Sequence, residues 1–157
     1  MSADLDASIG FAKKFTEDVL SFFGLNIDVT ATAADNEVIE VRIPSSNLNG
    51  FLIGQRGENM QSLQFLLSSA LKNNGFEYMR VSVDVADYKL QRADRLKHKA
   101  GDWVKSVTET GEPMELRNMN AADRRTIHQL AAEHGLVSQS VGEGRDRHIV
   151  LSRGETA

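Results

Sequence analysis

The residues best suited to bind a ligand lie between positions 51 and 60, where the sequence reads FLIGQRGENM. Gly54 and Gly57 enclose Gln55 and Arg56, and glycine adopts the positive φ angles that other residues avoid. A helical pattern begins at Gly57, and the start of a helix presents backbone N–H groups with the positive end of its dipole. With Arg56 as an added cation, the segment predicts a phosphate-binding loop. A tight turn between two helices is the alternative interpretation of an isolated glycine pair.

A second candidate site lies near the C-terminus, in the sequence ADRRTIHQLAAEHG. Arg124 and His128 are four residues apart, so a helix would present both on one face. Two donors placed in this way can bind one phosphate, or a phosphate and a base edge. Arg125 is adjacent, and Arg145 and Arg147 follow later, so these three arginines are predicted to extend the patch. The alternative is a solvated helix face whose histidine bonds to a local group.

The elements around the glycine pair alternate between helical and strand patterns. Apolar residues recur every three or four positions over residues 5–23, which predicts a helix whose apolar face includes Phe22 and Phe23. Alternation of apolar and polar residues predicts strands at 26–33, 37–43 and 78–85, with a turn at 34–36. A short helix is predicted before the glycines and a longer helix after them. The predicted order is helix, strand, strand, helix, glycine loop, helix, strand.

A second group of elements positions the arginines and the histidine. A long basic helix is predicted at residues 87–110, followed by a short strand at 113–119. Asn120 and Asp123 have the spacing of a capping box, and Gly135 is placed to end the helix that they begin. Two further strands, joined by the glycine-containing sequence GEGRDR, are predicted at 136–141 and 148–152.

The order of elements around the glycine pair resembles that of a type II KH domain. The sequence LIGQRGENMQSLQFLLSSAL is similar to the KH segment of the bacterial Jag proteins, also called KhpB. In that family an R-3-H domain follows, named for an arginine and a histidine separated by three residues, and Arg124 and His128 match this motif. The resemblance implies an α+β fold with a type II KH domain at 1–86. It also implies an R-3-H domain at 87–157, including the basic connecting helix 87–110.

The resemblance implies binding of single-stranded RNA, since a KH fold holds about four unpaired nucleotides with its GxxG loop. Beside the loop, Ile53 is a candidate for base contact, whereas Leu52 and Met60 fit the core better. No aromatic residue is expected there, so base stacking is not the predicted mode. The implied nucleic-acid-binding residues are Ile53, Gly54, Gln55, Arg56, Gly57, Arg124, Arg125, His128, Arg145 and Arg147.

Two departures from the family pattern affect these expectations. Many members carry an extra N-terminal module and a charged linker, and this chain is expected to lack them because it begins almost at the first KH helix. Functions that depend on the module are therefore not expected. The family often has two cations inside the glycine pair, and Gln55 in place of one is expected to weaken phosphate affinity.

Composition excludes several classes of protein. The chain has no cysteine, and the spacing of its four histidines gives no metal-binding pair, so neither a metal site nor another cofactor is expected. No catalytic constellation is visible, which predicts a protein that is not an enzyme. No apolar run has the length of a membrane span, and the acidic N-terminus does not resemble a signal peptide, so a cytoplasmic location without membrane insertion is expected.

The charge distribution leaves two functions open. Net charge is −4, and residues 1–85 carry six basic and 11 acidic residues, so contacts with nucleic acid must come from local patches. The favoured function is single-stranded RNA binding in post-transcriptional regulation, with single-stranded DNA as an alternative ligand. The other alternative is a protein-interaction adaptor. For that role the family implies a second small KH protein, and the membrane-insertase or cell-envelope machinery, as partners.

Overall fold

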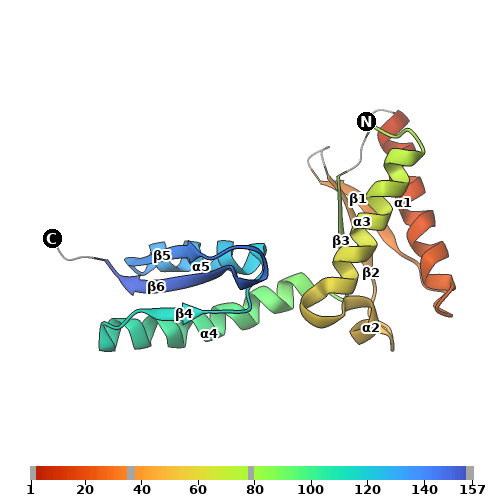
Figure 1. The fold of residues 1–157 in the computed structure, drawn as a ribbon. Coiled ribbons are helices and arrows are strands. Elements are labelled where there is room, and N and C mark those ends of the chain that lie inside the picture. The colour runs from red at the N-terminus through yellow and green to blue at the C-terminus, as the bar shows by residue number, and fades with distance from the viewer. Residues whose placement is uncertain (1–2, 35–37, 78–79, 155–157) are drawn as a thin grey trace. The chain divides into compact units, whose positions relative to one another are not determined.

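The computed structural model describes residues 3–34, 38–77 and 80–154 and divides into two compact units, Met1–Lys89 and Leu90–Ala157 (Figure 1). Each unit combines helices with a three-stranded sheet, which confirms the predicted α+β class. No helix in the described ranges is long and apolar enough to span a membrane.

The first unit is built on a mixed sheet with the strand order β1-β2-β3. Its elements are α1 (Ala3–Ser21), β1 (Thr30–Ala34), β2 (Val38–Ile43), α2 (Asn49–Ile53), the short 3-10 helix η1 (Gln55–Gly57), α3 (Glu58–Asn73) and β3 (Val81–Val85). β1 is antiparallel to β2, whereas β3 is parallel to it, with Ile39 opposite Val81 and Ile43 opposite Val85. Parallel neighbours need a crossover connection, which α2, the glycine loop and α3 supply. The glycine loop is therefore the junction between the two helices of this crossover.

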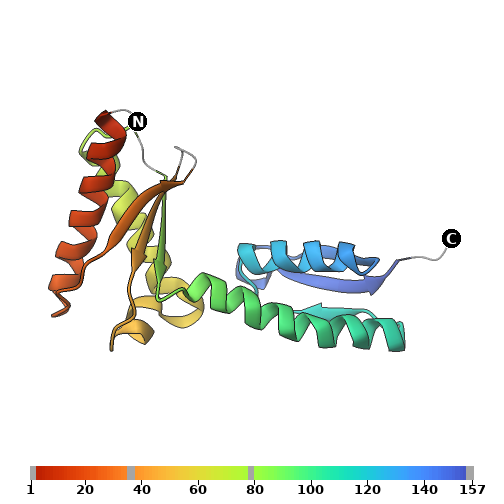
Figure 2. The same ribbon diagram turned by 180° about the vertical axis from the view of Figure 1, so that it is seen from behind.

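The core of the first unit lies between the sheet and the helices α1 and α3, which cover one face (Figures 1 and 2). Val41, Val83 and Leu67 are fully buried there. The prediction that Phe22 and Phe23 belong to the apolar face of the first helix is wrong, since they are 86% and 49% exposed. The helix ends at Ser21, and the turn that follows brings Leu25 into the core instead.

The first strand begins later than predicted. Residues 26–29 are not paired with β2, and Val29 is bonded to α1: its N–H donates to Glu17 at 3.0 Å and its carbonyl accepts from Lys13 at 2.8 Å. Strand pairing starts only at Thr30. The predicted turn at 34–36 and the first residues of the strand predicted at 78–85 fall largely outside the described residues.

The second unit places α5 beside an antiparallel sheet of strand order β4-β6-β5. Its elements are α4 (Tyr88–Thr110), which begins at the end of the first unit, β4 (Met114–Leu116), α5 (Ala121–Glu133), β5 (Leu136–Val141), the 3-10 helix η2 (Gly144–Asp146) and β6 (His148–Arg153). β5 is an edge strand, and only Gly135, with a φ of 67°, and His134 separate it from α5. The predicted hairpin between the last two strands is confirmed.

One ion pair joins the long helix to α5. The Arg92 guanidinium binds both carboxylate oxygens of Asp123, with Nε 2.9 Å from Oδ1. Their side chains are only 19% and 7% exposed. Asp123 also closes the predicted capping box, because its carboxylate accepts from the Asn120 N–H while its own N–H donates to the Asn120 side chain. The start of α5 is thus held both by its own cap and by α4.

We expect replacement of Asp123 by alanine to lower the free energy of unfolding of the second unit by about 2–4 kcal/mol. The change removes the bond that the Asp123 carboxylate accepts from the Asn120 N–H in the capping box, and it leaves the Arg92 charge partly buried without this carboxylate. Urea unfolding followed by the fluorescence of Trp103, the sole tryptophan, measures this loss. Arg95→Ala is the control, because it removes an exposed cation from α4, the helix that carries Arg92. Equal stability of the two variants would contradict the role given to Asp123.

Candidate nucleic-acid interface

The glycine loop adopts a left-handed backbone at three of its four residues. The φ angles of Gly54, Arg56 and Gly57 are 71°, 54° and 79°. The conformation is strained at Arg56, because a residue with a Cβ disfavours positive φ. Gln55 and Arg56 are both exposed at the tip of the loop. The chain therefore passes from α2 to α3 in four residues with a cationic side chain turned to solvent.

Close packing explains why both ends of the loop are glycine. A Cβ on Gly54 would lie 2.8 Å from Cγ of Asn59, and one on Gly57 would lie 3.2 Å from Cε1 of Tyr88. Both distances are shorter than an ordinary carbon–carbon contact. Each glycine thus combines a positive φ with a neighbour that leaves little room for a side chain.

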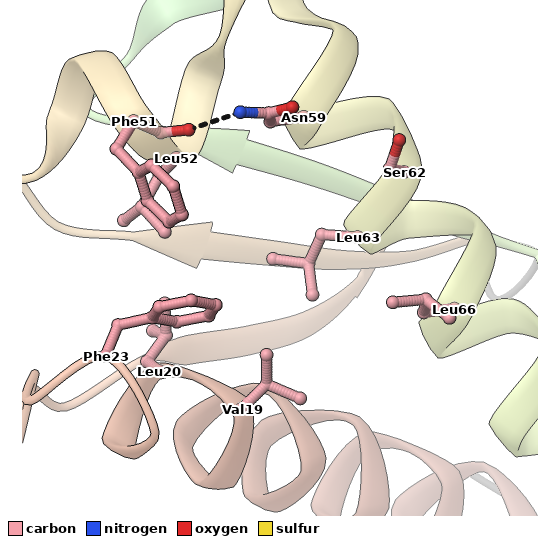
Figure 3. A pocket seen from close by; sticks show the side chains of 9 residues that line it. All are labelled: Val19, Leu20, Phe23, Phe51, Leu52, Asn59, Ser62, Leu63 and Leu66. Carbon is pink, nitrogen blue, oxygen red and sulfur yellow. Dashed lines mark hydrogen bonds between the residues drawn. The ribbon is translucent and has the colours of Figure 1, made fainter.

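Asn59 holds the two helices of the crossover together, and the sequence did not single it out. Its side-chain Nδ2 donates to the carbonyl of Phe51 at 2.7 Å, which satisfies one of the last carbonyl groups of α2 (Figure 3). Inside the loop, the N–H of Gly57 donates to Gly54, and that of Glu58 donates to Gln55. The first N–H groups near α3 are therefore used within the loop. The outward positive charge comes from the Arg56 side chain and the helix dipole.

The apolar residues beside the loop differ in how deeply they are buried, and the core positions favoured for Leu52 and Met60 are confirmed. Leu52 and Met60 are 6% and 3% exposed and belong to the core, whereas Ile53 is half-buried. The prediction that no aromatic residue lies beside the loop is wrong. Tyr88 packs against Gly57, although it is 31 positions away in the sequence.

Lys89 is a further cation of the first unit, at its C-terminal end. Its Nζ donates to the hydroxyl of Ser82 at 2.7 Å, and its backbone N–H donates to the carboxylate of Asp84. Desolvation lowers the pKa of Lys89 below its usual value of 10.5, although the nearby carboxylates of Asp84 and Glu40 act in the opposite direction. The lysine is thus bonded to the outer face of β3.

The structure gives Arg124 and His128 different partners. Nη1 of Arg124 donates to the carbonyl of Met119 at 3.0 Å, just before α5 begins. The His128 ring lies between two hydroxyls of β5, with Nδ1 2.6 Å from Ser138 Oγ and Nε2 3.0 Å from Ser140 Oγ. A histidine bonded to a local group was the alternative given for His128, but the sequence alone did not identify the serines as its partners. The two serines at alternating positions of the strand after the helix could have indicated this contact.

The other predicted cations of the second unit lie on its surface. Arg125 is exposed on α5, and Arg145 and Arg147 are exposed in the hairpin after β5. Because α5 and β5 are joined by a short turn and run in opposite directions, the start of α5 lies at the end of the sheet that carries this hairpin (Figure 1). No ion pair involving these three arginines occurs within the described residues.

An apolar cleft of about 290 Å³ opens between the end of α1 and the helices α2 and α3 (Figure 3). Phe23 and Phe51 face each other across it, with ring centroids 5.1 Å apart. Leu66, also at the rim, is 53% exposed, and Asn59 and Ser62 supply its polar groups. The cleft adjoins the glycine loop through Phe51 and Asn59.

Known proteins are similar in sequence to most of this chain. A family model of the R-3-H domain matches residues 94–153. The RNA-binding protein KhpB of Clostridium symbiosum is 30% identical over 143 residues, which cover 90% of this chain and 64% of that protein. The RNA-binding protein KhpB of Bacillus subtilis is 34% identical over 104 residues, covering 64% of this chain and 50% of that protein. These matches confirm the resemblance to KhpB.

A third relative is matched only in a short segment. The DNA-binding protein SMUBP-2 of Mesocricetus auratus is 50% identical over 36 residues, which cover 23% of this chain and 4% of that protein. The chain spans less than two thirds of the length of each of these three relatives.

We expect Gly57→Ala to lower the free energy of unfolding of the first unit by about 1–2 kcal/mol, because alanine is strained at positive φ and its Cβ would press on Tyr88. Urea unfolding followed by circular dichroism measures the change, with Trp103 fluorescence reporting the second unit separately. Gly50→Ala is the matched control and should not destabilise the unit, because a Cβ at this position of α2 would have no neighbouring atom within 4 Å. If both variants have the wild-type stability, the loop does not require glycine at position 57.

Proposed function

We propose that this chain, a relative of the KhpB proteins with an R-3-H domain at residues 94–153, binds single-stranded RNA through the loop Gly54–Gly57 and the helix that carries Arg124 and His128. The first unit would act as a type II KH domain over residues 1–86, and residues 87–157 would form the R-3-H unit. The proposed activity is binding alone, without cofactor, in cytoplasmic post-transcriptional regulation. Single-stranded DNA stays an alternative ligand.

The observation that carries the proposal is the geometry of the glycine loop. A left-handed segment with two solvent-exposed polar side chains ends at the start of α3, whose dipole favours a negative group. The element order of the first unit, with its parallel β2–β3 pair, supports the KH assignment. Half-buried Ile53 lies next to Gly54 and is suited to contact a base. The relatives' name, RNA-binding protein KhpB, supports RNA as the ligand.

The arginines of the second unit support a further contact with the backbone of the same kind of ligand. Arg125, Arg145 and Arg147 present exposed cations at one end of this unit. In nucleic-acid complexes such cations pair with phosphates, and these contacts do not depend on the base sequence. Base selection would then depend mainly on the first unit.

A protein-interaction adaptor is the second candidate function, and the apolar cleft is the observation that favours it. Phe23, Phe51 and Leu66 expose apolar surface beside the glycine loop, where a surface dedicated to the nucleic-acid backbone would be polar. A second small KH protein is the partner that the family resemblance implies. If the wild-type chain does not bind RNA, the adaptor function becomes the favoured one.

Replacement of both Gln55 and Arg56 by aspartate should reduce RNA affinity by at least about 10-fold. Each carboxylate would face a phosphate, and at about 4 Å the repulsion is on the order of 1 kcal/mol in water and larger where water is excluded. Fluorescence anisotropy with a U-rich single-stranded RNA measures the loss. The double variant Gln61→Asp with Lys72→Asp changes the net charge equally, but on exposed positions of α3 outside the loop, so it should retain most of the affinity.

Equal binding by both double variants would contradict a specific role for the loop and indicate a general charge effect. A wild-type chain that binds duplex RNA better than single-stranded RNA would also contradict the proposal, because a KH groove accommodates an unpaired strand.

A further inference from the structure

The environment of His128 leaves its ring no nitrogen for a ligand. Nδ1 and Nε2 each lie within hydrogen-bonding distance of one serine hydroxyl, at 2.6 and 3.0 Å. A histidine that bound a phosphate directly would need to break one of these contacts. The groups that surround the ring, and not the ring itself, are therefore the candidates for contact with a ligand.

The two serines are placed to make that contact. Ser138 and Ser140 alternate along β5, so both side chains lie on the face of the sheet that α5 covers. Both residues are half-buried, and β5 is an edge strand, with no further strand on its outer side among the residues that the structure describes. Their neighbours on β6, Leu151 and Ile149, are buried in the core. The hydroxyls thus lie at the border between the core and the solvent, beside α5.

Hydrogen-bond accounting shows what the serines can offer. A neutral imidazole donates one hydrogen bond and accepts one, so one serine accepts from the ring and the other donates to it. The serine that accepts keeps its own O–H for another partner, and that partner can be an anion. The second serine keeps its lone pairs for a donor such as a ribose hydroxyl. A protonated ring would donate to both serines and leave two O–H groups for a phosphate.

We infer that His128 is a positioning residue and that the hydroxyls of Ser138 and Ser140 contact the sugar-phosphate backbone of the bound strand. Arg125 and the hairpin arginines supply the charge that attracts the backbone, while the hydroxyls supply oriented hydrogen bonds. The inference rests on the proposed function. It adds two residues to the site and assigns the histidine a role exerted through them.

Removal of both hydroxyls tests the inference in the full chain. We expect Ser138→Ala with Ser140→Ala to weaken binding of a U-rich RNA, long enough to reach both motifs, by about 10-fold or more, as for lost hydrogen bonds to a charged group. Ser152→Ala is the matched control, because Ser152 pairs with Val137 on the opposite face of the same sheet. That variant should bind like the wild type. The conservative pair Ser138→Thr with Ser140→Thr keeps the hydroxyls and should restore most of the affinity.

A mutant cycle separates positioning from direct contact by His128. If the histidine acts through the serines, His128→Ala should weaken binding alone but cause no further loss in the double-alanine background. An additional loss there would show that the imidazole contacts RNA itself and would overturn the inference. Urea unfolding followed by Trp103 fluorescence confirms that each variant is folded.

The remaining outcomes are distinguishable. Wild-type affinity in the folded double-alanine variant, together with lost affinity in the Gln55→Asp and Arg56→Asp variant, would overturn this inference and leave the proposed function standing. The serines would then serve only to join α5 to β5. A wild-type chain that does not bind single-stranded RNA would overturn both.

Discussion

The parallel pairing of β2 with β3 is the constraint on which the candidate interface depends. A parallel neighbour cannot be reached by a tight hairpin, so the chain must cross over the sheet between Ile43 and Val81. Two helices make the crossing, and they meet in only four residues. That connection requires left-handed backbone at Gly54 and Gly57, and it leaves Gln55 and Arg56 at the surface. The exposed cationic loop is thus a consequence of the sheet topology.

The second unit has a similar dependence on one contact. The Asp123 carboxylate pairs with Arg92 of α4 and also accepts from the Asn120 N–H at the start of α5, so a single carboxylate bonds to two helices. The helix orientation that results places His128 over Ser138 and Ser140 on the edge strand. The two candidate contacts with a nucleic-acid backbone therefore rest on different physical causes. One is the conformational freedom of glycine, and the other is a partly buried ion pair.

The features that the sequence predicted well are local ones. The capping box of Asn120 and Asp123, the positive φ of Gly135 and the order of elements in both units follow from residue spacing and short-range hydrogen bonding. The predicted ends of strands and helices were less accurate where a residue far away in the sequence determines them. Val29 bonds to α1 instead of joining β1, and Phe23 leaves the core because the helix ends before it.

The parts of the site that were missed come from tertiary contacts. Tyr88 lies beside Gly57 from 31 positions further along the chain, and no pattern within residues 51–60 indicates this contact. His128 meets its serines because α5 folds back onto β5, which a helical motif read in isolation does not show. Asn59 was not singled out either, although its side-chain amide donates across the loop to the carbonyl of Phe51.

The most direct test of the central claim is nuclear magnetic resonance of the isotope-labelled full chain titrated with a U-rich single-stranded oligonucleotide. If the loop binds the strand, the largest changes in backbone amide shift in the first unit should fall on residues 53–57, with smaller changes in the cleft around Phe23 and Leu66. Changes confined to that cleft, or no changes in the loop at saturating RNA, would contradict the account.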